Sequence, residues 1–138
     1  MTIVKVEESV AASAGDVWNV LSDFGGIQVG GPVEAFEIEG EGVGAVRTLT
    51  MNGALIVERL DVHDAENMTF TYSIINEDCP LPVSNYSATV KIARDGDSGC
   101  TVNWSGSFEP AGDEEAACSM VRGIYTGAIQ RARKALGG

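Results

Sequence analysis

The sequence has little of what metal sites and disulfide frameworks need. Its 138 residues include one histidine, His63, and three cysteines, Cys79, Cys100 and Cys118. The cysteines are odd in number and form no C-x-x-C pair, and one histidine cannot supply the two-histidine spacing of a zinc site. We therefore expect free thiols in a reducing compartment, no metal and no other cofactor. His63 follows a strand-like run beside Asp64, where a solvated side chain is expected rather than a catalytic one.

Basic residues are also scarce. Nine Lys and Arg residues against twenty Asp and Glu residues give a formal net charge of −11. Phosphate backbones and anionic lipid headgroups repel such a surface, so nucleic acid is not the expected partner. No apolar run reaches the roughly 20 residues that span a bilayer, and the N-terminus has no signal-peptide core. The sequence predicts a soluble cytoplasmic protein without stable membrane insertion, and it leaves the oligomeric state open.

What is present fits one globular domain. The composition is 44% hydrophobic and 21% charged, which is ordinary for a folded protein. One hydrophobic core serves about 100 to 150 residues. We therefore expect a single domain over residues 1–138.

Residue patterns predict a strand, a short helix, six strands and a long helix. The first strand is expected over Ile3–Val10, and Ser13 is placed to cap a helix of roughly ten residues. The apolar stripe of this helix is expected to comprise Val17, Val20, Leu21 and Phe24, with Trp18 along its edge. The six strands are expected at Val33–Glu39, Val43–Met51, Ala54–His63, Met68–Ile75, Val83–Arg94 and Cys100–Glu109. Because short turns connect them, sequential strands should be antiparallel neighbours.

The last segment reads as one helix from Asp113, its N-cap, to Leu136. Its buried stripe is expected to comprise Ala117, Met120, Val121, Ile124, Ala128 and Ala132, packed against the curved sheet. Gly123 and Gly127 lie inside this helix, where each costs about 1 kcal/mol relative to alanine. We therefore expect the helix backbone to approach the sheet or a partner closely there.

One glycine-rich segment imitates a dinucleotide-binding motif. Gly40–Ala45 fits G-x-G-x-x-A, but a strand-like run follows it where that motif requires a helix. We expect a hairpin turn.

Alternation along the later strands gathers aromatic residues on one face. Tyr72, Tyr86 and Trp104 each carry a polar atom, and the small residues Ala88 and Gly106 alternate with them. Such a mixture is typical of a ligand pocket. The alternative is a filled core whose ring tips reach water.

Glu58 is the sharpest single signal. Alternation places it with Ile56, Leu60 and Val62 on the inner face of its strand. A desolvated carboxylate there could serve as acid, base or hydrogen-bond acceptor, or it could pair with Arg47 or a ring hydroxyl.

The order of elements resembles the helix-grip fold of the START/Bet v1-like (SRPBCC) superfamily. This is an α+β fold in which a seven-stranded curved antiparallel sheet wraps around a long C-terminal helix, with short helices after strand one. Ser13–Trp18, Asp23–Gly25, Glu58–Leu60 and the closing helix resemble the bacterial polyketide cyclase/dehydrase branch. The resemblance implies a cavity between sheet and helix for a hydrophobic small molecule such as a lipid, a polyketide or an isoprenoid. It also implies that some members catalyse cyclisation or dehydration while others bind or carry.

A second, more distant similarity is to the plant abscisic-acid receptors. It rests on Val43-Gly44, Glu58–Leu60, Asn85-Tyr86 and Phe108–Pro110. It implies that Glu58 and Tyr86 line the pocket. Because the receptor gate loop is shortened to Asn52–Ala54 and the latch is missing from Cys79–Pro82, a hormone-gated receptor is not expected.

Three functional hypotheses follow. In the first, a binding module, Tyr72, Tyr86, Trp104, Met120 and Ile124 surround an apolar ligand whose polar end is fixed by Glu58 and Arg47. In the second, an enzyme uses Glu58 or Tyr86 to move a proton on a carbonyl substrate. In the third, a protein-interaction module, loops at Gly25–Pro32 and Asn76–Pro82 gate the cavity mouth.

Overall fold

The computed structural model describes residues 2–26, 33–51, 53–76 and 81–137. Its strands are β1 (Thr2–Val10), β2 (Ala35–Glu39), β3 (Val46–Met51), β4 (Ala54–Asp64), β5 (Thr69–Ile74), β6 (Val83–Arg94) and β7 (Cys100–Pro110). Its helices are α1 (Ala14–Leu21) and α2 (Glu114–Leu136). The predicted order of strand, short helix, six strands and long helix is confirmed.

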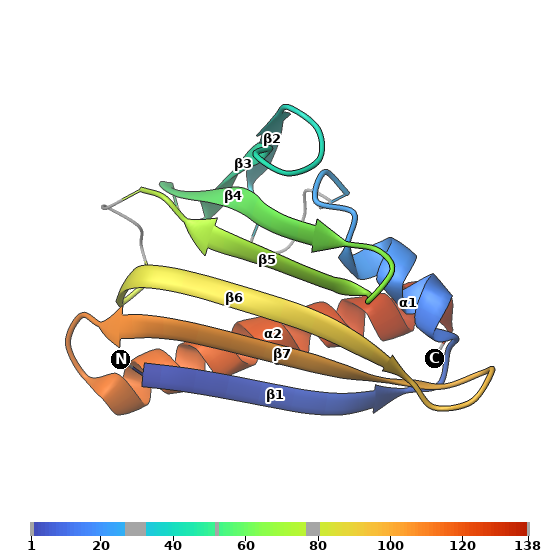
Figure 1. The fold of residues 1–138 in the computed structure, drawn as a ribbon. Coiled ribbons are helices and arrows are strands. Elements are labelled where there is room, and N and C mark those ends of the chain that lie inside the picture. The colour runs from blue at the N-terminus through green and yellow to red at the C-terminus, as the bar shows by residue number, and fades with distance from the viewer. Residues whose placement is uncertain (1, 27–32, 52, 77–80, 138) are drawn as a thin grey trace.

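All seven strands form one antiparallel sheet in the order β1-β7-β6-β5-β4-β3-β2. Sequential strands from β2 to β7 are neighbours, as the short turns predict, and β1 joins the sheet beside β7. Helix α2 packs against β1, β7 and α1. In Figure 1 the sheet curves over α2, while β2, β3 and β4 rise away from it. The concave face of the sheet therefore lies toward the long helix.

The turn between β2 and β3 explains why β3 is shorter than predicted. Gly40, Gly42 and Gly44 have φ of 85°, 66° and 94°, a region that residues with a β-carbon rarely adopt. The hairpin turn predicted for Gly40–Ala45 is confirmed, and its irregular backbone delays the start of β3 to Val46.

Helix α1 has the predicted cap but a rotated apolar face. The hydroxyl oxygen of Ser13 accepts the backbone N–H of Asp16 at 3.2 Å. Trp18 lies in the core, where its ring contacts those of His63 and Phe70, while Val20 is 38% exposed. The predicted stripe is wrong at these two positions because burying the larger tryptophan removes more apolar surface from water.

Helix α2 begins after Asp113, whose carboxylate accepts the N–H of Glu115, and ends at a left-handed Gly137. Its buried face comprises Ala117, Val121, Tyr125, Ile129 and Ala132. The predicted face is confirmed at Ala117, Val121 and Ala132. It is wrong at Met120, which is 46% exposed, and at Ile124 and Ala128, which are only partly buried. The helix buries the i, i+4 row through Tyr125 instead of the row through Met120 and Ile124, because this rotation brings the largest side chain of the helix into the core.

A bulge in β4 changes which of its side chains face the core. The register between β4 and β5 shifts between Leu60 and Val62. Leu60 is buried, whereas Val62, predicted to face inward, is 46% exposed. Because the extra residue of a bulge interrupts the two-residue alternation, the residues after it change face.

The helical glycines have room around them, contrary to expectation. A β-carbon at Gly123 would meet no atom within 4 Å, and one at Gly127 would only touch the Arg131 guanidinium at 3.5 Å. The close approach lies instead in β7, where a β-carbon at Gly106 would overlap the Tyr125 hydroxyl. Gly106 is therefore the glycine that the packing of α2 on the sheet requires.

The same substitution at these two glycines should have opposite effects. Gly106→Ala should lower the free energy of unfolding by about 1–3 kcal/mol because Tyr125 must move within a filled core. Gly123→Ala should raise it by up to about 1 kcal/mol through helix propensity. Denaturant unfolding followed by circular dichroism measures both. A neutral Gly106→Ala variant would contradict the close packing described.

Candidate functional site

A buried ion pair joins β3 and β4 on the inner face of the sheet. Arg47 and Glu58 are direct cross-strand partners, and Nε of Arg47 donates to Oε1 of Glu58 at 2.7 Å. Each residue is only 9% exposed. Glu58 therefore pairs with Arg47, which was one of the alternatives left open for it.

The guanidinium of Arg47 has further partners that hold it in place. Its Nη1 donates to the backbone carbonyl of Phe24 at 3.3 Å. Its central carbon lies 3.9 Å from the centre of the Phe24 ring and 5.3 Å from that of Tyr72. Stacking on two rings and a charged hydrogen bond offset part of the cost of removing the cation from water. The ion pair thus has one fixed geometry beside the aromatic residues.

Four aromatic residues, which we call the aromatic quartet, lie on the concave face. They are Tyr72 of β5, Tyr86 of β6, Trp104 of β7 and Tyr125 of α2. Nε1 of Trp104 donates to the Tyr72 hydroxyl at 3.3 Å, and the hydroxyls of Tyr86 and Tyr125 hydrogen-bond to each other. The rings of Trp104 and Tyr125 stack with centres 5.1 Å apart. Each polar ring atom therefore has a partner within the quartet.

The register of the sheet explains how the quartet fits. Ala88 of β6 is opposite Tyr72, and Gly106 of β7 is opposite Ala88. Two small residues on adjacent strands leave a depression beside the Tyr72 ring. The Tyr125 side chain reaches from α2 onto Gly106. The Tyr125 ring therefore occupies the space that these small residues leave over Gly106.

Burial sets the ionisation of the three tyrosines. It is the main cause that raises the pKa of Tyr72, Tyr86 and Tyr125 above the ordinary value of 10.0. The negative charge of Glu58 raises the pKa of Tyr72 and Tyr125 further. All three phenols therefore stay protonated and can donate hydrogen bonds at neutral pH.

Five of the seven predicted binding residues lie together on the concave face. They are Arg47, Glu58, Tyr72, Tyr86 and Trp104. Met120 is 46% exposed and Ile124 is partly buried, and their contact with a ligand stays a prediction. Sequence reasoning missed Tyr125. Two signals in the sequence could have found it. Tyr125 continues the i, i+4 row of Ala117 and Val121 in α2. The small residues Ala88 and Gly106 of the facing strands leave room for a large ring.

A pocket of about 450 Å³ lies where β5 and β6 separate. Pairing between these strands ends at Ser73 and Ser87, and the register of β6 with β7 shifts between Ser84 and Ser87. The lining comprises Ile74, Ile75, Asn76, Val83, Ser84, Asn85 and Tyr86. Tyr86 thus belongs to both this pocket and the aromatic quartet.

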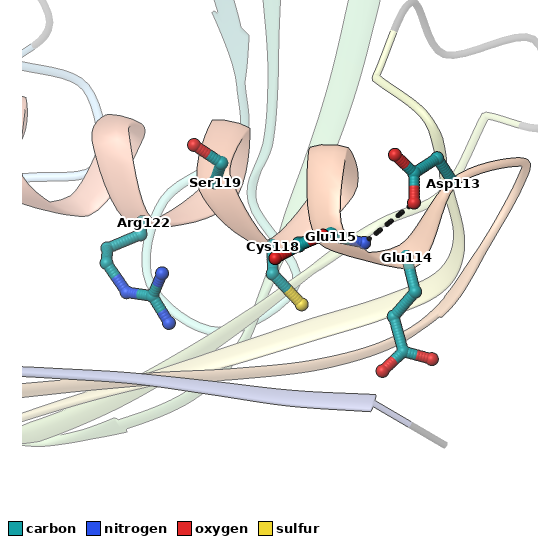
Figure 2. A pocket seen from close by; sticks show the side chains of 6 residues that line it. All are labelled: Asp113, Glu114, Glu115, Cys118, Ser119 and Arg122. Carbon is teal, nitrogen blue, oxygen red and sulfur yellow. Dashed lines mark hydrogen bonds between the residues drawn. The ribbon is translucent and has the colours of Figure 1, made fainter.

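Figure 2 shows a second, open pocket of about 710 Å³ at the N-terminus of α2. Its lining comprises Asp113, Glu114, Glu115, Cys118, Ser119 and Arg122. The Asp113 carboxylate accepts the N–H of Glu115 and so serves as the helix cap. None of the predicted binding residues lines this pocket.

Several expectations concern residues beyond those described. Residues 27–32 and 77–80, which include Cys79 and most of the two expected gate loops, lie outside the described part of the chain. Within that part, Cys100 and Cys118 are free thiols and no three His, Cys, Asp or Glu side chains cluster as metal ligands would. No helix of the described residues has the length and apolar character to cross a membrane.

The buried phenols predict an alkaline titration unlike that of free tyrosine. These three are the only tyrosines of the chain. The native protein should develop no tyrosinate absorbance near pH 10, while the guanidinium-unfolded chain should. Since the unfolded chain then releases protons that the native one keeps, stability should be fully present below pH 10 and fall above it, by up to about 4 kcal/mol per pH unit for three groups. A native midpoint near 10 would contradict their burial.

Solved structures of other proteins share this architecture. An uncharacterised protein from Bacillus thuringiensis matches with a TM-score of 0.84 and 28% identity, covering 99% of this chain and 100% of that one. The protein XoxI from Bacillus cereus matches with a TM-score of 0.85 and 28% identity over 99% and 96%. Norcoclaurine synthase from Thalictrum flavum, in complex with dopamine and hydroxybenzaldehyde, matches with a TM-score of 0.74 over 98% and 85%. At 23% identity, that last likeness shows the fold alone.

The fold is thus the Bet v1-like helix-grip fold, as the resemblance implied. No curated protein matches the sequence. The sequence pattern of one family, described as polyketide cyclase / dehydrase and lipid transport, matches residues 1–137. The chain therefore belongs to the polyketide cyclase/dehydrase and lipid transport family.

Proposed function

We propose that the protein binds a hydrophobic small molecule, of lipid, polyketide or isoprenoid type, between the concave face of the sheet and α2. The observation that carries this proposal is the buried Arg47–Glu58 pair on that face. A buried ion pair adds little stability compared with apolar residues of the same size. Ligand binding is therefore a better reason than stability for an ion pair on the concave face. The family description, which includes lipid transport, supports the same class of ligand.

In this proposal Glu58 fixes the polar end of the ligand. Arg47 uses only Oε1 of Glu58, and no described residue hydrogen-bonds to Oε2. That oxygen is free to accept a hydroxyl of the ligand. Arg47 holds the carboxylate in place, while Tyr72 and the other quartet rings offer apolar surface to the rest of the molecule. The cytoplasmic location expected from the sequence stays a prediction.

A charge-free variant separates binding from folding. The double variant Arg47→Met/Glu58→Leu should unfold with nearly the wild-type free energy, whereas Arg47→Met alone should cost about 3–5 kcal/mol by leaving Glu58 unpaired. Binding is measured by displacement of the fluorophore N-phenylnaphthylamine. Naphthol should lose about tenfold in affinity for the double variant because a hydrogen bond to a charged acceptor is lost.

Methylnaphthalene, which lacks the hydroxyl, is the matched probe and should bind both proteins alike. Equal affinity of naphthol for the wild-type and double-variant proteins would show that the pair does not contact the ligand. Failure of the fluorophore and of both probes to bind the wild-type protein would overturn the proposed function itself.

Catalysis is the second candidate, and the free Oε2 of Glu58 favours it. A carboxylate with an unused oxygen could remove a proton beside a ligand carbonyl while Tyr86 donates to the carbonyl oxygen. Such proton transfer is the chemistry that cyclisation and dehydration share. Glu58→Gln would remove the base and keep the shape.

Deuterium exchange tests this without knowledge of the substrate. In heavy water, wild-type protein should speed exchange of the methyl protons of acetylnaphthalene, measured by NMR. Glu58→Gln should reduce that acceleration about a hundredfold or more. Glu37→Gln, which removes an exposed carboxylate of β2, is the control and should leave the rate unchanged. Exchange that persists in Glu58→Gln would exclude Glu58 as the base.

A further inference from the structure

The aromatic quartet has more hydrogen-bond donors than its own bonds use. Its four donor hydrogens are the indole N–H of Trp104 and the hydroxyls of Tyr72, Tyr86 and Tyr125. Trp104 donates to Tyr72, and Tyr86 pairs with Tyr125. These two bonds use two hydrogens. Tyr72 keeps its own hydrogen, and the two hydroxyls of Tyr86 and Tyr125 keep one hydrogen that has no acceptor within the quartet.

No described residue outside the quartet takes that hydrogen. Among the described residues, the hydrogen bonds of the three hydroxyls all end on other members of the quartet. A buried donor without an acceptor costs free energy comparable to that of a lost hydrogen bond. The quartet is thus complete only when an acceptor from elsewhere joins it.

The two hydrogen bonds place the spare hydrogen. Because the Trp104 indole can only donate, the Tyr72 oxygen is the acceptor in their bond. The other bond joins the hydroxyls of Tyr86 and Tyr125, which we call the phenol pair. Whichever of these hydroxyls donates to the other, the second one keeps its hydrogen unused.

The pocket between β5 and β6 reaches one member of the phenol pair. Tyr86 forms part of its wall, and Ile74, Ile75 and Val83 supply apolar surface beside it. Its volume of about 450 Å³ suits a small organic molecule. Strand pairing ends at Ser73 and Ser87, so β5 and β6 do not close over it.

We propose that the phenol pair donates a hydrogen bond to an uncharged carbonyl oxygen of the ligand, so that the protein selects apolar ketones or quinones over hydrocarbons of the same shape. This inference rests on the proposed function and names the ligand class. A carbonyl oxygen only accepts, which matches a site whose unused group is a donor.

The surroundings explain why the oxygen is uncharged. Burial and the charge of Glu58 keep Tyr125 from ionising. The same low dielectric disfavours a carboxylate or phenolate of the ligand at this position.

Two probes of equal shape test the selection. Acetylnaphthalene and isopropenylnaphthalene, substituted at the same ring position, differ by C=O against C=CH2. The measured quantity is their ratio of dissociation constants, from displacement of N-phenylnaphthylamine. In Tyr86→Phe/Tyr125→Phe the preference for the ketone should fall roughly two- to tenfold relative to wild type. Tyr125→Phe alone leaves the hydroxyl of Tyr86, which lines the pocket, with its hydrogen unused and should keep most of the preference.

Thr71→Val is the matched control, since it removes a hydroxyl from the Thr71–Thr89 hydrogen bond between β5 and β6 but leaves the phenol pair. It should keep the wild-type ratio. A wild-type ratio in the double variant, or an equal loss in Thr71→Val, would overturn the inference while both probes still bind. Binding of neither probe to the wild-type protein would instead overturn the proposed function.

A second measurement needs no variant. The carbonyl stretching band of acetylnaphthalene bound to the wild-type protein should lie at lower wavenumber than in cyclohexane, because a hydrogen bond weakens the C=O bond. A band at the cyclohexane position would show that no donor reaches the oxygen, and would overturn the inference even if the double variant failed to fold.

Discussion

The contact between the Tyr125 hydroxyl and Gly106 determines how the long helix lies on the sheet. A side chain at position 106 would exclude the phenol, and a smaller residue at 125 would leave the depression beside Ala88 empty. Because Tyr125 must point at Gly106, the rotation of α2 about its axis is set. The exposure of Met120 follows from that rotation, as does the burial of Ile129.

The same contact brings polar atoms under the sheet, where each needs a partner. Tyr125 meets Tyr86, and Trp104 both stacks on Tyr125 and donates to Tyr72. Beside this quartet, Arg47 and Glu58 neutralise each other. The concave face thus combines apolar ring surface with unused phenol hydrogens and one unused carboxylate oxygen. An apolar molecule with a polar end matches such a surface.

Membership in the family leaves the function open between binding and catalysis. The family description joins cyclases, dehydrases and lipid transport, which share a fold and differ in what their side chains do. In this chain the difference depends on whether Glu58 only accepts a hydrogen bond or also removes a proton. Arg47 bears on that choice, because it binds Oε1 of Glu58 and leaves Oε2 to accept a hydrogen bond or a proton from a ligand.

The sequence by itself determined the elements and their order, because capping residues, turn residues and two-residue alternation act over a few neighbouring positions. These local signals include the helix caps Ser13 and Asp113. They also include the alternation along the strands, which turned Glu58, Tyr72, Tyr86 and Trp104 inward. The resemblance to a known family added the helix-grip arrangement. The sequence left pairing of Glu58 with Arg47 as one of several alternatives. Only the register of β3 on β4 places these two residues opposite each other.

Tertiary structure alone decided which faces of the helices are buried, where alternation breaks, and how the rings pair. Trp18 and Tyr125 entered the core because large rings outweigh smaller apolar residues on an adjacent helix face. The bulge after Leu60 turned Val62 outward, and no residue type marks its position. The quartet forms from three strands and a helix that are distant in sequence. Its hydrogen-bond count, and the spare donor that follows from it, exist only once β5, β6, β7 and α2 meet.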